Sequence, residues 1–161
     1  MTTTSHFHAR LADWSLPQDR GLLRAVREAV FVREQNIPAE LEWNEAVDSQ
    51  CLHVLAQDGT GQAIGTGRLK PDGQIGRLAV LSGWRGRGVG GLLLRTLTAL
   101  ARQHQLAPVW LDAQLQTVEF YAHRGFQAKG EPFREAGIPH RRMVLTTVVP
   151  EAKVSANGQR P

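Results

Sequence analysis

The residues best suited to chemistry form one short stretch, Arg85-Gly86-Arg87-Gly88-Val89-Gly90-Gly91. Glycines let a backbone approach a ligand closely, and arginines carry forked donors that fit phosphate oxygens. The stretch follows the apolar run Arg77–Leu81 and precedes leucines at helical spacing. Because the start of a helix exposes N–H groups and a partial positive charge, this spacing predicts a site for a pyrophosphate. A glycine-rich turn that binds nothing is the alternative.

The elements before this loop are predicted from periodicity. We expect a first strand over Phe7–Trp14, then a helix to Val32 that Ser15 caps and Pro17 opens. Residues 33–50 are expected to be a loop, with a short helix as an alternative for part of it, and its five acidic residues either form a solvated surface or line a site for a cationic group. Strand-like runs separated by glycine turns then predict an antiparallel meander over Cys51–Gln57, Gln62–Lys70 and Gln74–Leu81.

The elements after the loop alternate between helix and strand. A helix over 88–104 is followed by a strand over Pro108–Gln114, which the intervening helix predicts to be parallel to the strand before the loop. A helix over Thr117–Arg124 ends at Gly125, and two strands follow, from Phe126 and over Arg141–Val148. The last residues, 150–161, lack apolar periodicity and are expected to be a disordered tail.

Size and composition exclude several classes of protein. The length of 161 residues fits one domain, expected over residues 1–149. No apolar run approaches the ~18 residues of a membrane span, and no signal peptide is evident, so we expect a cytoplasmic protein without a membrane partner. Cys51 is the only cysteine, and the histidines lack metal-like spacing with carboxylates, so no metal is expected. The charge of +4 is spread over scattered arginines, which argues against nucleic acid as a partner.

Taken together, these motifs resemble the GNAT superfamily of acyl-CoA-dependent N-acetyltransferases. Within it, the chain is most similar to the small bacterial members of the ElaA/YjcF type. The resemblance extends from Val30 to His140 and includes the loop pattern Arg-x-x-Gly-x-Gly. It rests on these segments: Val30–Pro38, Arg77–Leu81, Arg85–Gly91, Ala113-Gln114, Phe120-Tyr121, Gly125-Phe126 and Ala136–His140.

The resemblance implies a fold and a co-substrate. The fold would be α/β (α+β), the GNAT acyl-CoA N-acyltransferase fold, with a mixed central sheet of six to seven strands and about four helices. The co-substrate would be acetyl-CoA, with coenzyme A as product. Its pyrophosphate would lie on Arg85, Gly86, Arg87, Gly88, Val89, Gly90 and Gly91. Its pantetheine arm would pair with the backbone of Leu78, Ala79 and Val80 and contact Gln114, where the family more often has Asn.

The resemblance also implies catalytic roles. Tyr121 would be the general acid that donates a proton or hydrogen bond to the departing sulfur, although a tyrosine packed on a helix face is the alternative. The amine acceptor must lose a proton, and the candidate bases are Glu34, Glu45, Asp48, His53 and His140. Of these, Glu34 and His140 are favoured as bases or substrate contacts, whereas His53 fits a core position equally well. Trp43 is a candidate substrate contact.

The second substrate is not specified by the sequence. The acceptor could be a small-molecule amine or a protein amine, and a homodimer is possible because such dimers are common in the family. A non-catalytic acyl-CoA sensor of the same fold is the first alternative, and a basic nucleic-acid-binding domain is the second.

Overall fold

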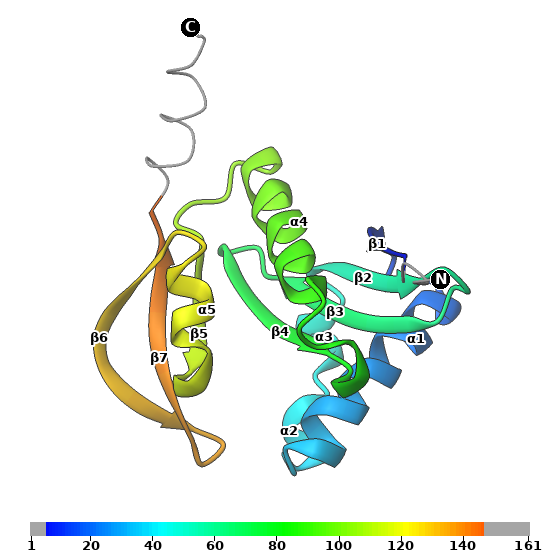
Figure 1. Ribbon diagram of the computed structural model, residues 1–161, viewed down its shortest axis with the longest axis horizontal. Coiled ribbons are helices and arrows are strands. Elements are labelled where there is room, and N and C mark those ends of the chain that lie inside the picture. The colour runs from blue at the N-terminus through cyan, green and yellow to red at the C-terminus, as the bar shows by residue number, and fades with distance from the viewer. Residues whose placement is uncertain (1–5, 147–161) are drawn as a thin grey trace, which may run out of the picture. The chain divides into compact units, whose positions relative to one another are not determined.

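The computed structural model describes residues 6–146 (Figure 1). The chain divides into two compact units, residues up to Ala107 and residues from Pro108. The expected tail at 150–161 and the end of the last expected strand lie outside the described residues. The single domain over 1–149 stays a prediction.

The first unit contains an antiparallel sheet. Its strands are neighbours in the order β1-β2-β3-β4, which confirms the meander and adds the first strand at its edge. The register shifts where Thr66 pairs with Ala79 but Arg68 pairs with Gly76, so Arg77 and Leu78 of β4 form a bulge opposite Gly67. The strands are β1 (Phe7–Ala12), β2 (Leu52–Asp58), β3 (Ala63–Leu69) and β4 (Gln74–Val80).

The start of the first helix of this unit differs from expectation. The first helix begins at Pro17 with Leu16 as its N-cap; the hydroxyl of Ser15 instead donates to Asp13 (2.7 Å), so capping by Ser15 was wrong. Residues 33–50 contain two short helices, in agreement with the alternative of a short helix in that stretch. The elements are α1 (Pro17–Arg27), a π-helix (Glu28–Glu34), α2 (Ala39–Glu42), α3 (Glu45–Asp48) and α4 (Val89–Gln103).

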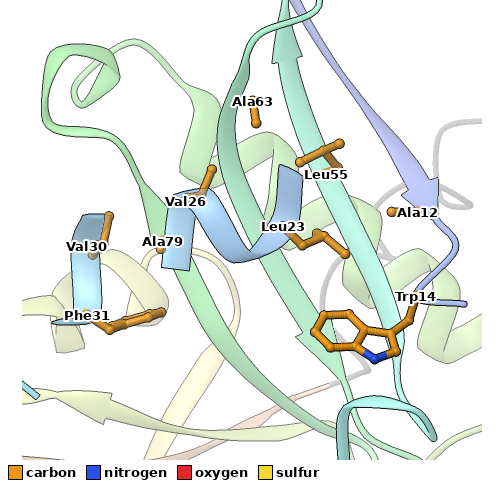
Figure 2. Packing of buried hydrophobic residues seen from close by; sticks show 9 residues of the cluster. All are labelled: Ala12, Trp14, Leu23, Val26, Val30, Phe31, Leu55, Ala63 and Ala79. Carbon is orange, nitrogen blue, oxygen red and sulfur yellow. The ribbon is translucent and has the colours of Figure 1, made fainter. Parts of the chain in front are cut away.

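The core lies on both faces of this sheet. Leu23 and Val26 of α1 pack over Leu55 of β2 and Ala63 of β3 on one face (Figure 2). Figure 2 also shows Val30 and Phe31, from the π-helix after α1, in the same cluster. Leu23 and Leu55 are fully buried, so this face anchors the chain segment that leads to Glu34.

The opposite face of the sheet holds α4 very close to β3. A Cβ at Gly65 would lie 2.9 Å from the Cδ1 of Leu93, and one at Gly67 only 2.5 Å from the Cδ1 of Leu97. A side chain at either position would force the leucines of α4 to move away. The two glycines of β3 therefore set the height of α4 above the sheet, and with it the position of the helix start that follows the glycine loop.

The second unit is a three-stranded antiparallel sheet with one short helix. Its strands are neighbours in the order β5-β7-β6, and α5 ends before Gly125, whose φ of 93° suits glycine. The elements are β5 (Trp110–Gln114), α5 (Val118–Ala122), β6 (Phe126–Glu135) and β7 (Ile138–Leu145). Among residues 6–146, the helices are all too short or too polar to cross a membrane.

Candidate active site

The glycine loop joins β4 to α4 in the geometry of an anion site. Gly86 and Gly88 have φ values of 76° and 93°, a backbone conformation that other residues adopt only with strain. Gly88 is the N-cap of α4, so Val89, Gly90 and Gly91 form its first turn. The N–H groups of a first turn have no partner four residues earlier and present a partial positive charge. The loop can therefore offer several amides to a pyrophosphate.

Arg85 of the glycine loop is bound by Glu34, a residue predicted to be a base or substrate contact. Its Nη1 and Nη2 donate to the two carboxylate oxygens of Glu34 at 2.6 and 2.7 Å, and its Nε donates to the carbonyl of Val80 at 3.0 Å. The hydrogen bonds from Arg85 lower the pKa of Glu34. A carboxylate whose ionised form is stabilised in this way is a weak proton acceptor, so this arrangement disfavours Glu34 as the base.

Arg87, the second arginine of the loop, lies on an aromatic surface. Its guanidinium carbon is 4.9 Å from the centre of the Trp84 ring, a cation–π distance. Trp84 in turn meets the ring of Phe7 edge-on, with centroids 6.1 Å apart. The Phe7 ring also lies 3.9 Å from where a Cβ on Gly88 would be. The edge strand β1 therefore packs against the glycine loop through the ring of Phe7.

A network of buried charges joins five elements of the first unit. The carboxylate of Asp48 accepts from Arg27 and Arg68, both at 3.0 Å, and the carboxylate of Glu42 accepts from Arg27 (2.6 Å) and Arg77 (3.0 Å). Burial opposes ionisation of Asp48, but the hydrogen bonds and charges of Arg27 and Arg68 outweigh it and lower the pKa of this carboxyl. Glu42 and Asp48 therefore do not form a solvated acidic surface.

Two of the other base candidates are also engaged in structural contacts. The ring of His53 stacks on Trp14 (centroids 4.6 Å apart), and its Nε2 lies 2.8 Å from the carbonyl oxygen of Asp48. Burial lowers the pKa of His53, which is the behaviour of a core histidine. Glu45 accepts from the Trp14 indole at 2.9 Å and lies 3.6 Å from Arg24.

Trp43 lines an open groove beside α1, with a volume of about 540 Å³. One face of its ring is taken by Arg27, whose guanidinium carbon lies 5.1 Å from the ring centre. The rest of the groove is lined by Gly21, Arg24, Ala25 and Glu28. Trp43 therefore combines a structural contact with exposure to the groove, and its role as a substrate contact stays a prediction.

Tyr121 lies on α5 in the second unit. Its ring meets Phe120 and Phe126 edge-on, at centroid distances of 5.1 and 5.9 Å. The residue is 9% exposed, and burial raises the pKa of its phenol. The hydroxyl therefore keeps its proton at neutral pH, the form that a hydrogen-bond donor or general acid requires.

His140 is held in one tautomer by its own strand. Its Nδ1 lies 2.6 Å from the carbonyl oxygen of Ile138, and because a carbonyl only accepts, this nitrogen carries the proton. The Nε2 atom is left with the lone pair and lies 3.9 Å from the carboxylate of Glu135. The ring stacks on Phe133, and His140 is the register partner of Gln114 on β5. The second unit thus brings two predicted site residues side by side.

Sequence reasoning missed the buried charge network and the neighbours of His140. Arg27 occupies a position on the apolar stripe of α1 four residues after Leu23, and Arg68 interrupts a strand whose other residues are all small, apolar or threonine. Charged residues at such positions need buried partners, and the acidic stretch of residues 40–48 is the source that the sequence offers. Glu135 and Phe133 carried no signal, because their proximity to His140 depends on hairpin register.

Comparison with known proteins identifies the family. A family model described as an acetyltransferase (GNAT) domain matches residues 23–147. The chain belongs to the GNAT family. It is 38% identical over 123 residues to the protein named "uncharacterized N-acetyltransferase YjcF" of Bacillus subtilis, covering 74% of this chain and 86% of that protein. It is 33% identical over 135 residues to ElaA of Escherichia coli, covering 80% and 88%.

Solved structures agree with this family assignment. An acyl-CoA N-acyltransferase from Pseudomonas aeruginosa matches with a TM-score of 0.71 and 28% identity, covering 89% of this chain and 100% of that one. The crystal structure of Escherichia coli ElaA matches with a TM-score of 0.72 and 26% identity, again over 89% and 100%. The protein therefore has the GNAT acyl-CoA N-acyltransferase fold and is an acyltransferase, and the resemblance inferred from its motifs is confirmed.

Proposed function

We propose that this GNAT acyltransferase moves the acetyl group of acetyl-CoA directly to a primary amine, without a covalent enzyme intermediate. The observation that carries the proposal is the glycine loop, in which Gly86 and Gly88 have positive φ angles and Gly88 leads into the first turn of α4. Such a turn binds the doubly charged pyrophosphate through backbone amides, with Arg87 adding a full charge. Leu78, Ala79, Val80 and Gln114 would hold the pantetheine arm.

The proposed chemistry uses two residues of the second unit. The neutral amine attacks the thioester carbonyl, a C–N bond forms, and the tetrahedral oxyanion collapses with loss of the C–S bond. Tyr121 donates its hydroxyl hydrogen to the departing sulfur, and the raised pKa of this phenol keeps that hydrogen in place beforehand. His140 accepts the proton of the amine at Nε2, because its Nδ1 hydrogen is committed to Ile138. Glu135 then stabilises the imidazolium.

Residues 33–50 present less unpaired negative charge to an acceptor than their composition implies. Four of the five carboxylates there contact arginines, as the pairs Glu34–Arg85, Glu42–Arg77, Glu45–Arg24 and Asp48–Arg68 illustrate. We therefore propose that the acceptor, a small-molecule or protein amine, is selected by shape and hydrogen bonding more than by attraction to this segment. A homodimer and a cytoplasmic location stay predictions.

Two measurements test the proposal. Thermal unfolding with and without CoA tests donor binding: CoA at 100 times Kd should stabilise the protein by about 2.7 kcal/mol. A panel of primary amines with acetyl-CoA, followed by thiol release, then tests transfer. Binding of CoA with no thiol release from any amine would favour the acyl-CoA sensor. No stabilisation at millimolar CoA would contradict the proposal altogether.

The variant His140→Gln tests the assignment of the base. It should reduce kcat while CoA stabilises the variant as it does the parent. A variant with unchanged kcat would remove His140 from the reaction.

A further inference from the structure

Two ion pairs flank the part of β4 that is proposed to bind acyl-CoA. Arg77 comes directly before Leu78–Val80, and Arg85 follows shortly after them. Arg77 pairs with Glu42 (Nε–Oε1, 3.0 Å), and Arg85 pairs with Glu34 (Nη1–Oε2, 2.6 Å). Both glutamates belong to one short stretch of chain, residues 34–42, which we call the clamp segment.

The Arg77–Glu42 pair, which lies just before Leu78–Val80 in β4, holds a strained residue. Arg77 has a φ of 49°, an uncommon conformation for a residue with a side chain, and it forms part of the β4 bulge. Its partner Glu42 is 2% exposed and is itself fixed by Arg27 at 2.6 Å. The bulge is therefore tied to a carboxylate that cannot move without disturbing the core.

The Arg85–Glu34 pair, which lies just after Leu78–Val80, holds β4 and the glycine loop together. The guanidinium of Arg85 donates to both oxygens of Glu34 and, through Nε, to the carbonyl of Val80. Because the planar guanidinium of Arg85 donates hydrogen bonds in two directions, its orientation is fixed. The last carbonyl of β4, the loop residue Arg85 and the end of the π-helix are thus joined at one point.

We infer that the clamp segment is a positioning element for the donor substrate. Glu34 and Glu42, acting through Arg85 and Arg77, set the backbone of residues 78–80 and of the glycine loop in the arrangement that binds acyl-CoA. Glu34 and the Arg85 side chain are then positioning residues, and the loop amides are the ligands of the pyrophosphate. This inference rests on the proposed function, since it assumes that β4 and the loop bind acyl-CoA.

The variant Glu34→Gln tests the clamp with little risk to folding, because the Glu34–Arg85 pair is 44% and 43% exposed. It should raise the Kd of CoA and the KM of acetyl-CoA about 3- to 5-fold and leave the KM of the amine unchanged. Amide hydrogen exchange of residues 78–88 in the free protein should accelerate relative to β2.

The chain offers a matched control and a second variant. Glu28→Gln breaks an exposed pair with Arg33 (3.5 Å) on the same π-helix and should change neither CoA affinity nor exchange at β4. Arg77→Gly removes the Glu42 contact but relieves the strain at a φ of 49°, so it should fold while loosening residues 78–80.

The outcomes separate the clamp from the function on which it rests. Wild-type CoA affinity and exchange in Glu34→Gln and Arg77→Gly would overturn the clamp. Tighter CoA binding by Glu34→Gln would also overturn it, because Arg85 would then be a ligand for which Glu34 competes. Absence of CoA binding by the wild type would refute the proposed function, while exchange in the free protein would still decide whether residues 34–42 hold β4.

Discussion

At the scale of single residues, the surroundings of a side chain decide which chemistry it can perform. Tyr121 and Glu34 were both predicted as catalytic residues from their types and positions. Burial raises the pKa of Tyr121 and keeps it a donor, whereas two hydrogen bonds from Arg85 lower the pKa of Glu34 and weaken it as an acceptor. Residue type alone could not distinguish these outcomes, because the partner of Glu34 is distant in the sequence.

The variant Tyr121→Phe removes one hydroxyl from a buried ring and should leave the packing against Phe126 intact. If the phenol assists departure of the thiolate, kcat should fall on the order of 10²-fold while the affinity for CoA is retained. Steady-state kinetics and CoA titration measure the two quantities separately. An equal loss of affinity and rate would instead indicate a binding role.

Asp19 provides a prediction about acid stability. Hydrogen bonds from Arg10 and from the Asp13 backbone lower its pKa from 3.8 to about 2. The unfolded state therefore binds more protons between about pH 4 and pH 2, so the contribution of Asp19 is complete above this window and is lost as pH falls through it. Since Arg10 is 37% exposed, we expect Asp19→Asn to cost about 1 kcal/mol at pH 6.

Urea unfolding at several pH values measures this cost. The difference between Asp19→Asn and the parent should shrink steadily below pH 4. A deficit of the same size at pH 3 and pH 6 would mean that the variant disturbs packing and not an ionised contact.

At the scale of elements, the positions of strands and helices were largely predictable and their ends were not. The strand runs and the long helix after the loop follow strong periodicity, and the structure has them within a few residues. Residues 33–50 were expected to be a loop, with a short helix as an alternative, because Pro38 and the charges obscure any period. In the structure, burial of Glu42 and Asp48 against arginines holds two short helices there, and such pairing leaves no local pattern.

The close contact between β3 and α4 gives a prediction at this scale. A Cβ at Gly67 would meet two leucine side chains, at 2.5 Å from Leu97 and 3.2 Å from Leu78. Gly67→Ala should therefore destabilise the protein by about 1–3 kcal/mol through overpacking. Gly76→Ala on β4 is the matched control, because its nearest neighbour is the flexible end of Arg68 at 3.9 Å. Equal effects of the two substitutions on urea unfolding would contradict the argument.

At the scale of the whole molecule, buried ion pairs connect elements of the first unit in addition to its apolar core. Arg27, Arg68 and Arg77 meet Glu42 and Asp48 from five different helices and strands. Breaking a buried pair strands a charge, so the cost is much greater than that of a surface pair. The composition of the chain shows an ordinary charge content and gives no sign of this arrangement.

Asp48→Asn tests this network. It should lower the free energy of unfolding by about 3–5 kcal/mol at neutral pH, because Arg27 and Arg68 lose their shared counter-charge. Arg27 and Arg68 overcome the effect of burial and lower the pKa of Asp48, so the parent should lose this stabilisation in acid and the variant should not. Glu40→Gln on the exposed side of the same segment is the control. A small, pH-independent effect of Asp48→Asn would show that the network contributes little.

The pairing of carboxylates in residues 34–48 with arginines also affects the rate at which a second substrate associates. A cluster of free acids would draw a polycation from a distance, and its association rate would fall steeply as ionic strength rises. Here arginines cancel most of that field at short range. Encounter of an amine with this side of the protein should therefore depend on ordinary diffusion, with a rate nearly independent of salt.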